Sequence, residues 1–577
     1  VIDQFGRRQT KTPIGVSEPI DGAVYTGNLY GARHPENRHQ IQAQRQRRQS
    51  IKMLEARKKK VVYVVIKSGY RVHRCMSLQD CFQCDSETRQ KVSPADIFTF
   101  CHARNLTIVT NFKAYRQEAR AMAVIAWPII IAQLAQMGTG VVDTIMAGRY
   151  SAVDLAAIAI GYNLWLPLFL LTLGIMLATS VLVAQDFGAG RLQSIRDTLP
   201  QGLWLALLLG IIVGPACYST EPLLRLLDLD AITHQKSLDY LQAVAWGLPA
   251  TALFQALRCH TQGLGILRPF AVASVLGFIA NIPLNYALIY GKWGFPEMGA
   301  AGCGWATAIS MWLTAMLIAA YMATQQTIRK YLPPFRYAAP DPAKLREIFV
   351  LGIPIGLTFF LEIGVLSLIA LMIATMGNNA MAAHQIAYNV WDVIYMPLIS
   401  MGSAMATRMG HAIGGGDEQQ VRLAIKTGTA MTLMIGLAST LLLLPMPGAL
   451  IGIYTDDPGI HSIAVRLIHL AALFIVIDSL QVAASYGLRA FKETRFPFMA
   501  MCLSYWGLSL PLAWWLGIKV ADNPGDGTAG VWTSLIAGIC LCAVLVTWRL
   551  LRILRQPLSQ LTARAADENS QGIPVGG

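Results

Sequence analysis

The sequence is dominated by apolar segments, most of them longer than the roughly 20 residues that a helix needs to cross a bilayer. Inside the hydrocarbon, only helices and closed barrels pair every backbone group, and segments of this length favour helices. The chain is 54% hydrophobic and only 14% charged, whereas soluble proteins are about one quarter charged. The sequence therefore predicts an all-α polytopic membrane protein with twelve transmembrane helices, near 121–146, 154–184, 198–218, 238–260, 268–290, 300–324, 346–376, 380–408, 424–446, 461–486, 496–518 and 528–553.

The two sets of six segments form an internal repeat. Pro128 corresponds to Pro354, and Tyr-Asn-Leu-Trp at 162–165 corresponds to Tyr-Asn-Val-Trp at 388–391, at the same spacing. An even number of helices gives both halves the same orientation, so the pseudo-two-fold axis runs along the membrane normal. Such repeats place substrate and ion sites at the interface between two lobes that rock against each other. Further pairs follow the repeat: Gly188 with Gly414, Pro269 with Pro497, and Gly302 with Gly530.

The repeat and the charge distribution predict four regions. Residues 1–117 form a basic extension, with 21 Lys and Arg against 9 Asp and Glu, which we expect to be disordered or non-native. Residues 118–335 and 336–555 form two pseudo-symmetric six-helix lobes, and residues 556–577 form a cytoplasmic tail. The rest of the chain carries 26 basic against 24 acidic residues, so we expect no nucleic-acid partner for the membrane core.

The extension contains one candidate metal site. Cys81 and Cys84 form a C-x-x-C pair, which is a weak zinc signal because no second, properly spaced pair follows. No firm metal site is predicted elsewhere.

The distribution of basic residues predicts the orientation. With both termini in the cytoplasm, twenty Lys and Arg near the membrane-spanning part lie on the cytoplasmic side and six on the other. Cytoplasmic loops carry this excess in membrane proteins, which supports that orientation.

Three isolated carboxylates stand inside the predicted crossings. Asp143, Glu362 and Asp478 are each surrounded by apolar residues. An aspartate at a helix centre costs about 2.5–3.5 kcal/mol, so such groups usually face a cavity and have a function. The alternative for Asp143 is a position in the headgroup layer, because Arg149 follows it closely.

Neutral polar residues accompany these carboxylates. Asn281 and Asn285 are four residues apart and therefore lie on one face of the fifth crossing. Their alternative role is ordinary hydrogen bonding inside the helix bundle. Five further residues are candidates for lining a cavity, with packing or a misjudged depth as the alternative: Gln136, Gln481, Asp392, Trp391 and Tyr388.

These side chains suit cation exchange. A carboxylate in a low-dielectric cavity takes up a proton more readily, and with several neutral oxygens it can hold Na⁺ instead. Its ionised form attracts a cationic, amphipathic compound, and occupancy by a proton or an ion weakens that attraction. This difference in binding is what alternating access requires.

Several longer motifs make the chain similar to a known family. They are WPIIIAQLAQMGTGVVDTIMAG, LVAQDFGAGR, ANIPLNYALIYG, GAAGCGWATAIS, MAAHQIAYNVWD and SYGLRAFKETRFPF, and the similarity covers residues 118 to about 555. The chain resembles the MATE (multidrug and toxic compound extrusion) family, in its NorM-like branch.

The resemblance implies a V-shaped pair of lobes with a central cleft, which exports organic cations against Na⁺ or H⁺ across a bacterial inner membrane. By the same resemblance, Asp143, Glu362 and Asp478 occupy the family's carboxylate positions, and Asn281 and Asn285 its polar positions near Asp143. Asp392 matches no family position, and the family does not need the basic extension.

Other classes of function fit less well. A flippase of lipid-linked oligosaccharide precursors would need several arginines in the cleft for the pyrophosphate, and the crossings offer almost none. An enzyme would need a paired nucleophile and base, whereas His260, His384 and His411 are isolated. A channel would need a filter-like motif. We therefore expect a transporter without a cofactor, whose partners are organic cations, the coupling ion and the lipid bilayer.

Overall fold

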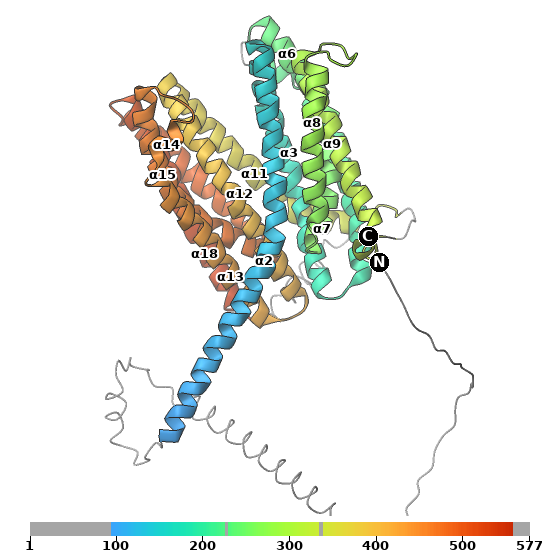
Figure 1. The fold of residues 1–577 in the computed structure, drawn as a ribbon, viewed down its shortest axis with the longest axis vertical. Coiled ribbons are helices and arrows are strands. Elements are labelled where there is room, and N and C mark those ends of the chain that lie inside the picture. The colour runs from blue at the N-terminus through green and yellow to red at the C-terminus, as the bar shows by residue number, and fades with distance from the viewer. Residues whose placement is uncertain (1–93, 226–228, 334–337, 558–577) are drawn as a thin grey trace, which may run out of the picture. The chain divides into compact units, whose positions relative to one another are not determined.

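The computed structural model describes residues 94–225, 229–333 and 338–557, and these residues are helical apart from short connections (Figure 1). Contacts divide the chain into two units, Val1–Phe100 and Cys101–Gly577, and the helices described below lie in the second unit, apart from the first turns of α2. Cys81 and Cys84, the candidate zinc pair, lie outside the described residues.

The first six crossings form what we call the first lobe. It consists of α2 (Pro94–Tyr150), α3 (Ala152–Gly188), α4 (Leu192–Tyr218), α5 (Glu221–Leu224), α6 (Ala231–Ala245), α7 (Leu248–Gly263), α8 (Arg268–Ile289), α9 (Gly299–Thr324) and α10 (Gln326–Arg329).

The remaining helices form the second lobe. It consists of α11 (Pro342–Ala374), α12 (Asn378–Gly414), α13 (Glu418–Leu443), α14 (Pro447–Ile451), α15 (Pro458–Ala490), α16 (Arg495–Met501), η3 (Cys502–Ser509), α17 (Leu510–Trp514), η4 (Trp515–Lys519) and α18 (Pro524–Leu554).

The helices account for the twelve predicted crossings. Within the described residues, ten helical spans are long and apolar enough to cross a membrane. The crossing expected at 238–260 is broken at Trp246 and Gly247 into α6 and α7, of 15 and 16 residues. The eighth crossing, α12, has 37 residues and is not among these ten spans. The prediction of an all-α, twelve-helix fold is confirmed.

Two crossings differ from the expected regular helices. α2 begins at Pro94, inside the range assigned to the extension, and proline fits the first turn of a helix because its missing N–H needs no partner there. The eleventh crossing alternates between α-helix and the π-helical segments η3 and η4, which flank Pro511. Proline removes one backbone donor and clashes with the preceding turn, so the hydrogen-bond pattern must adjust locally.

The lobes meet along α3, which packs against α11 and α12 (Figure 1). Small residues allow this close approach, as they do at other helix interfaces in membranes. A side chain on Gly188 would clash with the carbonyl oxygen of His411, and one on Gly414 would clash with that of Gln185. The repeat relates one of these pairs to the other, so each lobe contributes the same type of contact. The pseudo-two-fold axis therefore passes between α3 and α12.

Candidate functional site

In the first lobe, Asp143 lies in a small polar cluster formed by three helices. The Asp143 carboxylate on α2 is 7% exposed. Its Oδ1 accepts a hydrogen bond from Asn285 Nδ2 on α8 at 2.6 Å, and its Oδ2 accepts one from Thr307 Oγ1 on α9 at 3.1 Å. Asn285 Nδ2 also donates to Asn281 Oδ1 at 2.8 Å. The structure thus brings Asp143, Asn281 and Asn285 together inside the lobe.

The cluster holds a carboxylate without a neighbouring cation. Among the described residues, Asp143 forms no ion pair, and its hydrogen bonds come from an amide and a hydroxyl. Asn285 Oδ1 and Asn281 Nδ2, both buried, have no hydrogen-bond partner in the same part of the chain. If the Asn285 amide rotates, its Oδ1 replaces Nδ2 beside the carboxylate. The cluster then offers oxygens from Asp143, Asn281, Asn285 and Thr307, the atoms that hard cations prefer.

Thr307 was not among the residues that the sequence singled out. Threonine occurs in many crossings and usually bonds to a carbonyl of its own helix, as Thr314 does to Ser310 on α9. Only the packing of α9 against α8 distinguishes Thr307, because it turns that hydroxyl towards Asp143.

The second lobe contains the other two carboxylates. Asp478 on α15 is 4% exposed, and its Oδ2 accepts a hydrogen bond from Trp391 Nε1 at 3.4 Å. Glu362 on α11 is half-buried and close enough to Asp478 for their charges to interact. Trp391 stacks on Tyr395, with ring centroids 4.9 Å apart, and this fixes the indole that donates to Asp478. The two carboxylates therefore share one region of the lobe.

The remaining predicted lining residues surround these groups in different ways. Tyr388 packs against Trp391, with ring centroids 5.5 Å apart. Gln481 Nε2 lies 3.7 Å from Cys542 Sγ, which is a weak contact. Gln136 and Asp392 are half-buried, and neither forms a hydrogen bond within the described part of the chain.

Two tyrosines related by the repeat connect the carboxylate groups of the two lobes. Tyr162 on α3 lies within electrostatic range of Asp143 in its own lobe and of Asp392 in the other. Tyr388 on α12 lies within range of Tyr162, Asp392 and Glu362. Tyr162 and Tyr388 therefore lie within electrostatic range of carboxylates from both six-helix bundles.

Polar contacts between the lobes gather at one end of the crossings. Glu118 at the start of the first crossing accepts two hydrogen bonds from Arg408, from Nε at 2.9 Å and from Nη2 at 2.7 Å. Gln420 Nε2 donates to the same carboxylate at 2.6 Å. Three more contacts join the lobes nearby: Gln262 with Ser403, His411 with Gly263, and Gln185 with Ala490. At the opposite end, the ion pairs Lys236–Asp154 and Arg466–Asp526 each stay within one lobe.

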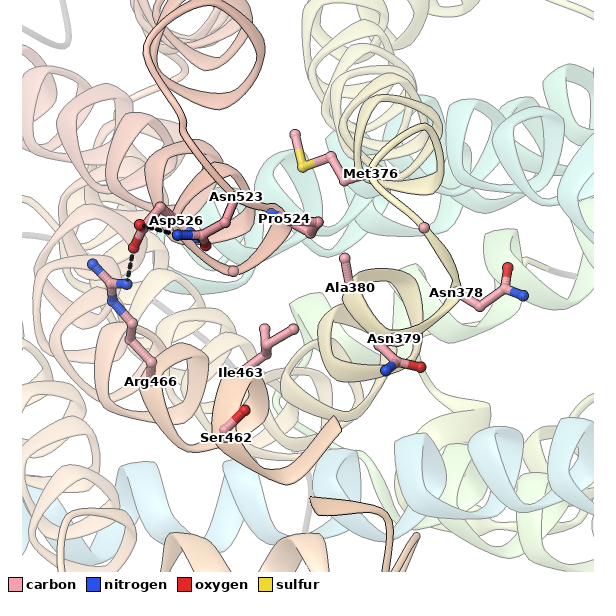
Figure 2. A pocket seen from close by; sticks show the side chains of 12 residues that line it. Met376, Asn378, Asn379, Ala380, Ser462, Ile463, Arg466, Asn523, Pro524 and Asp526 are labelled. Carbon is pink, nitrogen blue, oxygen red and sulfur yellow. Dashed lines mark hydrogen bonds and ion pairs between the residues drawn. The ribbon is translucent and has the colours of Figure 1, made fainter. Parts of the chain in front are cut away.

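A cavity of about 550 Å³ opens at this opposite end of the second lobe, away from the carboxylates (Figure 2). Figure 2 shows the Arg466–Asp526 pair on its wall, with Asn523 bonded to the same carboxylate. Arg466 and Asp478 are both on α15, and twelve residues of helix separate them by about 18 Å along its axis. This cavity is thus not part of the carboxylate region. Within the described residues, no three His, Cys, Asp or Glu side chains are grouped to hold a metal ion.

Comparisons with known proteins identify the family. The MatE family profile matches residues 128–287 and 354–515, and the two matches begin at the prolines that align in the repeat. The chain belongs to the MatE family. It is 39% identical to multidrug resistance protein PmpM of Pseudomonas aeruginosa over 77% of this chain and 94% of that protein. It is 35% identical to multidrug resistance protein MdtK of Edwardsiella ictaluri over 78% of this chain and 99% of that protein.

Solved structures confirm the fold of this MatE family member. The eukaryotic MATE transporter AtDTX14 superimposes with a TM-score of 0.71 at 19% identity, covering 79% of this chain and all of that one. An outward-facing multidrug resistance MATE family transporter of the MOP superfamily superimposes with a TM-score of 0.67, also at 19% identity, covering 77% of this chain and 97% of that one. The twelve-helix, V-shaped MATE fold expected from the resemblance is therefore the fold of this chain.

The Asp143 cluster predicts an unequal response to two similar substitutions on α9. Thr307→Val removes one donor from a buried carboxylate and should destabilise the protein by about 1 kcal/mol or more. Thr314→Val removes a hydroxyl that bonds only within its own helix and should cost less. Thermal unfolding of both purified variants in the same detergent measures the difference. Equal losses of melting temperature would show that Thr307 does not hold Asp143.

Proposed function

We propose that this chain is a secondary antiporter that exports cationic, amphipathic compounds in exchange for Na⁺ or H⁺. We place it in a bacterial inner membrane with both termini in the cytoplasm. The relatives from Pseudomonas and Edwardsiella are named multidrug resistance proteins, which supports this substrate class. The observation that carries the proposal is the pair of buried carboxylate groups, one in each lobe, with two tyrosines within electrostatic range of both, while the polar contacts between the lobes among the described residues gather at one end.

The coupling follows from how Asp143 is held. Its ionised form keeps a full negative charge beside neutral donors, and this attracts an organic cation into the region between the lobes. A proton or Na⁺ at the same oxygens removes that attraction. The compound is then released, because the coupling ion and the compound compete for one charge. Glu362 and Asp478 give the second lobe the same capacity.

Alternation of access follows from where the lobes touch. The inter-lobe contacts lie at the end that the distribution of Lys and Arg assigns to the cytoplasm. With this predicted orientation, the inter-lobe contacts close the cytoplasmic side. Rocking the lobes to the inward-open state must break the bonds of Glu118 to Arg408 and Gln420, and new contacts must form at the opposite end.

The alternative of a lipid-linked oligosaccharide flippase is not favoured by the relatives or by the site. A pyrophosphate would need a cluster of arginines in the cleft. The two buried arginines of the described crossings, Arg258 and Arg489, lie in different lobes, and each guanidinium packs on an aromatic ring.

Replacing Asp143 with Asn tests the proposed function directly. The asparagine keeps the size of the side chain and removes its charge, so efflux of a cationic dye such as ethidium from proteoliposomes should fall to the protein-free rate. Transport is measured under an imposed Na⁺ gradient and under an imposed pH gradient, one at a time, which also identifies the coupling ion. Asp197→Asn, at an exposed aspartate, is the control and should retain full activity. Normal efflux by folded Asp143→Asn protein would refute the proposed role.

The cytoplasmic closure predicts a second effect. Glu118→Gln should weaken the bonds to Arg408 and shift the population towards the inward-open state, because a buried bidentate pair loses its charge. Labelling of a cysteine introduced at Thr407, which is 4% exposed beside the seam, should then become several-fold faster. Glu418→Gln disrupts the exposed pair with Arg422 within one helix and provides the control. If both variants label at the wild-type rate, the Glu118 contact does not hold the lobes closed.

A further inference from the structure

Arg489 is a buried cation at the seam between the lobes. It lies near the end of α15, is 8% exposed, and forms no ion pair among the described residues. Its guanidinium is held between two aromatic rings, 4.5 Å from the centroid of Tyr486 and 5.1 Å from that of Phe359. Cation–π contacts offset only part of the cost of removing such a charge from water. The nitrogen Nη1 has no hydrogen-bond partner in this part of the chain.

A small cavity lies beside this guanidinium. The cavity has a volume of about 20 Å³ and is lined by residues of both lobes, including Ser180, Gln262, Thr407 and Arg489. A space of this size holds one water-sized particle, since a single water needs about 10–15 Å³. Larger anions such as sulfate or gluconate do not fit.

The polar groups on the wall suit an anion. Gln262 Nε2 is placed 2.8 Å from Ser403 Oγ, while its Oε1 has no partner among the described residues. In the opposite amide orientation Ser403 donates to Oε1, and Nε2 takes the position without a protein partner, where it can donate to a bound group. In that orientation the first lobe contributes a second N–H donor to the wall of the cavity that Arg489 also lines. The Gln262 amide and the positively charged Arg489 guanidinium would then both donate hydrogen bonds into the cavity, and such a site suits an anion rather than a cation.

No carboxylate of the described residues pairs with Arg489 beside this cavity. Glu362 is on α11 one turn beyond Phe359 and interacts with Arg489 only through space. No carboxylate lies within 4 Å of the Arg489 guanidinium in the described residues. We propose that the cavity between Gln262 and Arg489 binds one small monovalent anion of the size of chloride, which joins the two lobes while the cytoplasmic side is closed.

The test uses the purified full chain and needs no transport assay, so it is independent of the proposed function. The melting temperature is measured as gluconate is replaced by chloride at constant ionic strength. Ligand binding to the folded state should raise it with the logarithm of chloride concentration above the dissociation constant. Arg489→Gln should abolish this rise. Arg466→Gln removes an exposed positive charge and should leave the rise intact. An unchanged wild-type melting temperature, or an equal rise in Arg489→Gln, would overturn the proposal.

A second measurement keeps the proposal testable if Arg489→Gln fails to fold. Crystals of the wild-type protein grown in bromide should show an anomalous scattering peak between Gln262 and Arg489. Electron density for a water molecule at that position, without an anomalous peak, would show that the cavity is hydrated and would overturn the proposal.

Discussion

The structure depends on keeping a carboxylate charge inside an apolar bundle without a cation beside it. The Asp143 carboxylate on α2 accepts hydrogen bonds from Asn285 on α8 and Thr307 on α9. These three helices must therefore stay packed together for the carboxylate to keep its hydrogen-bond donors. In the proposed function, a cation or a proton that reaches Asp143 offsets the cost of its charge at membrane depth. The burial that makes this charge costly then also makes the first lobe favour positively charged compounds.

The internal repeat also determines how the two lobes contact each other. Because α3 and α12 are equivalent in the repeat, their glycine contacts are reciprocal and involve both lobes in the same way. The polar bonds of Glu118, His411 and Gln262 lie at the same end of the helices as these contacts. In the proposed cycle, the glycine contacts and the polar bonds at this end separate together when the lobes rock to the inward-open state.

Much of this arrangement could be predicted from the sequence. The apolar segments and the repeat predicted twelve helices in two lobes, and the spacing of Asn281 and Asn285 placed both amides on one helix face, where the structure has them. Long-range pairings could not be predicted, because the sequence does not say which helices touch. The hydroxyl of Thr307, the bond of Glu118 to Arg408 and the break between α6 and α7 all depend on packing across helices.

Distances across both ends of the two lobes would test this account most directly. Spin labels at 232 and 453 report on the outer end, and labels at 192 and 551 report on the cytoplasmic end. Pulsed electron spin resonance in lipid nanodiscs would measure both distances, first in the presence of a cationic dye and then in the presence of the coupling ion. The account predicts that one distance lengthens as the other shortens, and that Asp143→Asn abolishes the response. Two distances that stay fixed, or that change in the same direction, would contradict an antiporter built from rocking lobes.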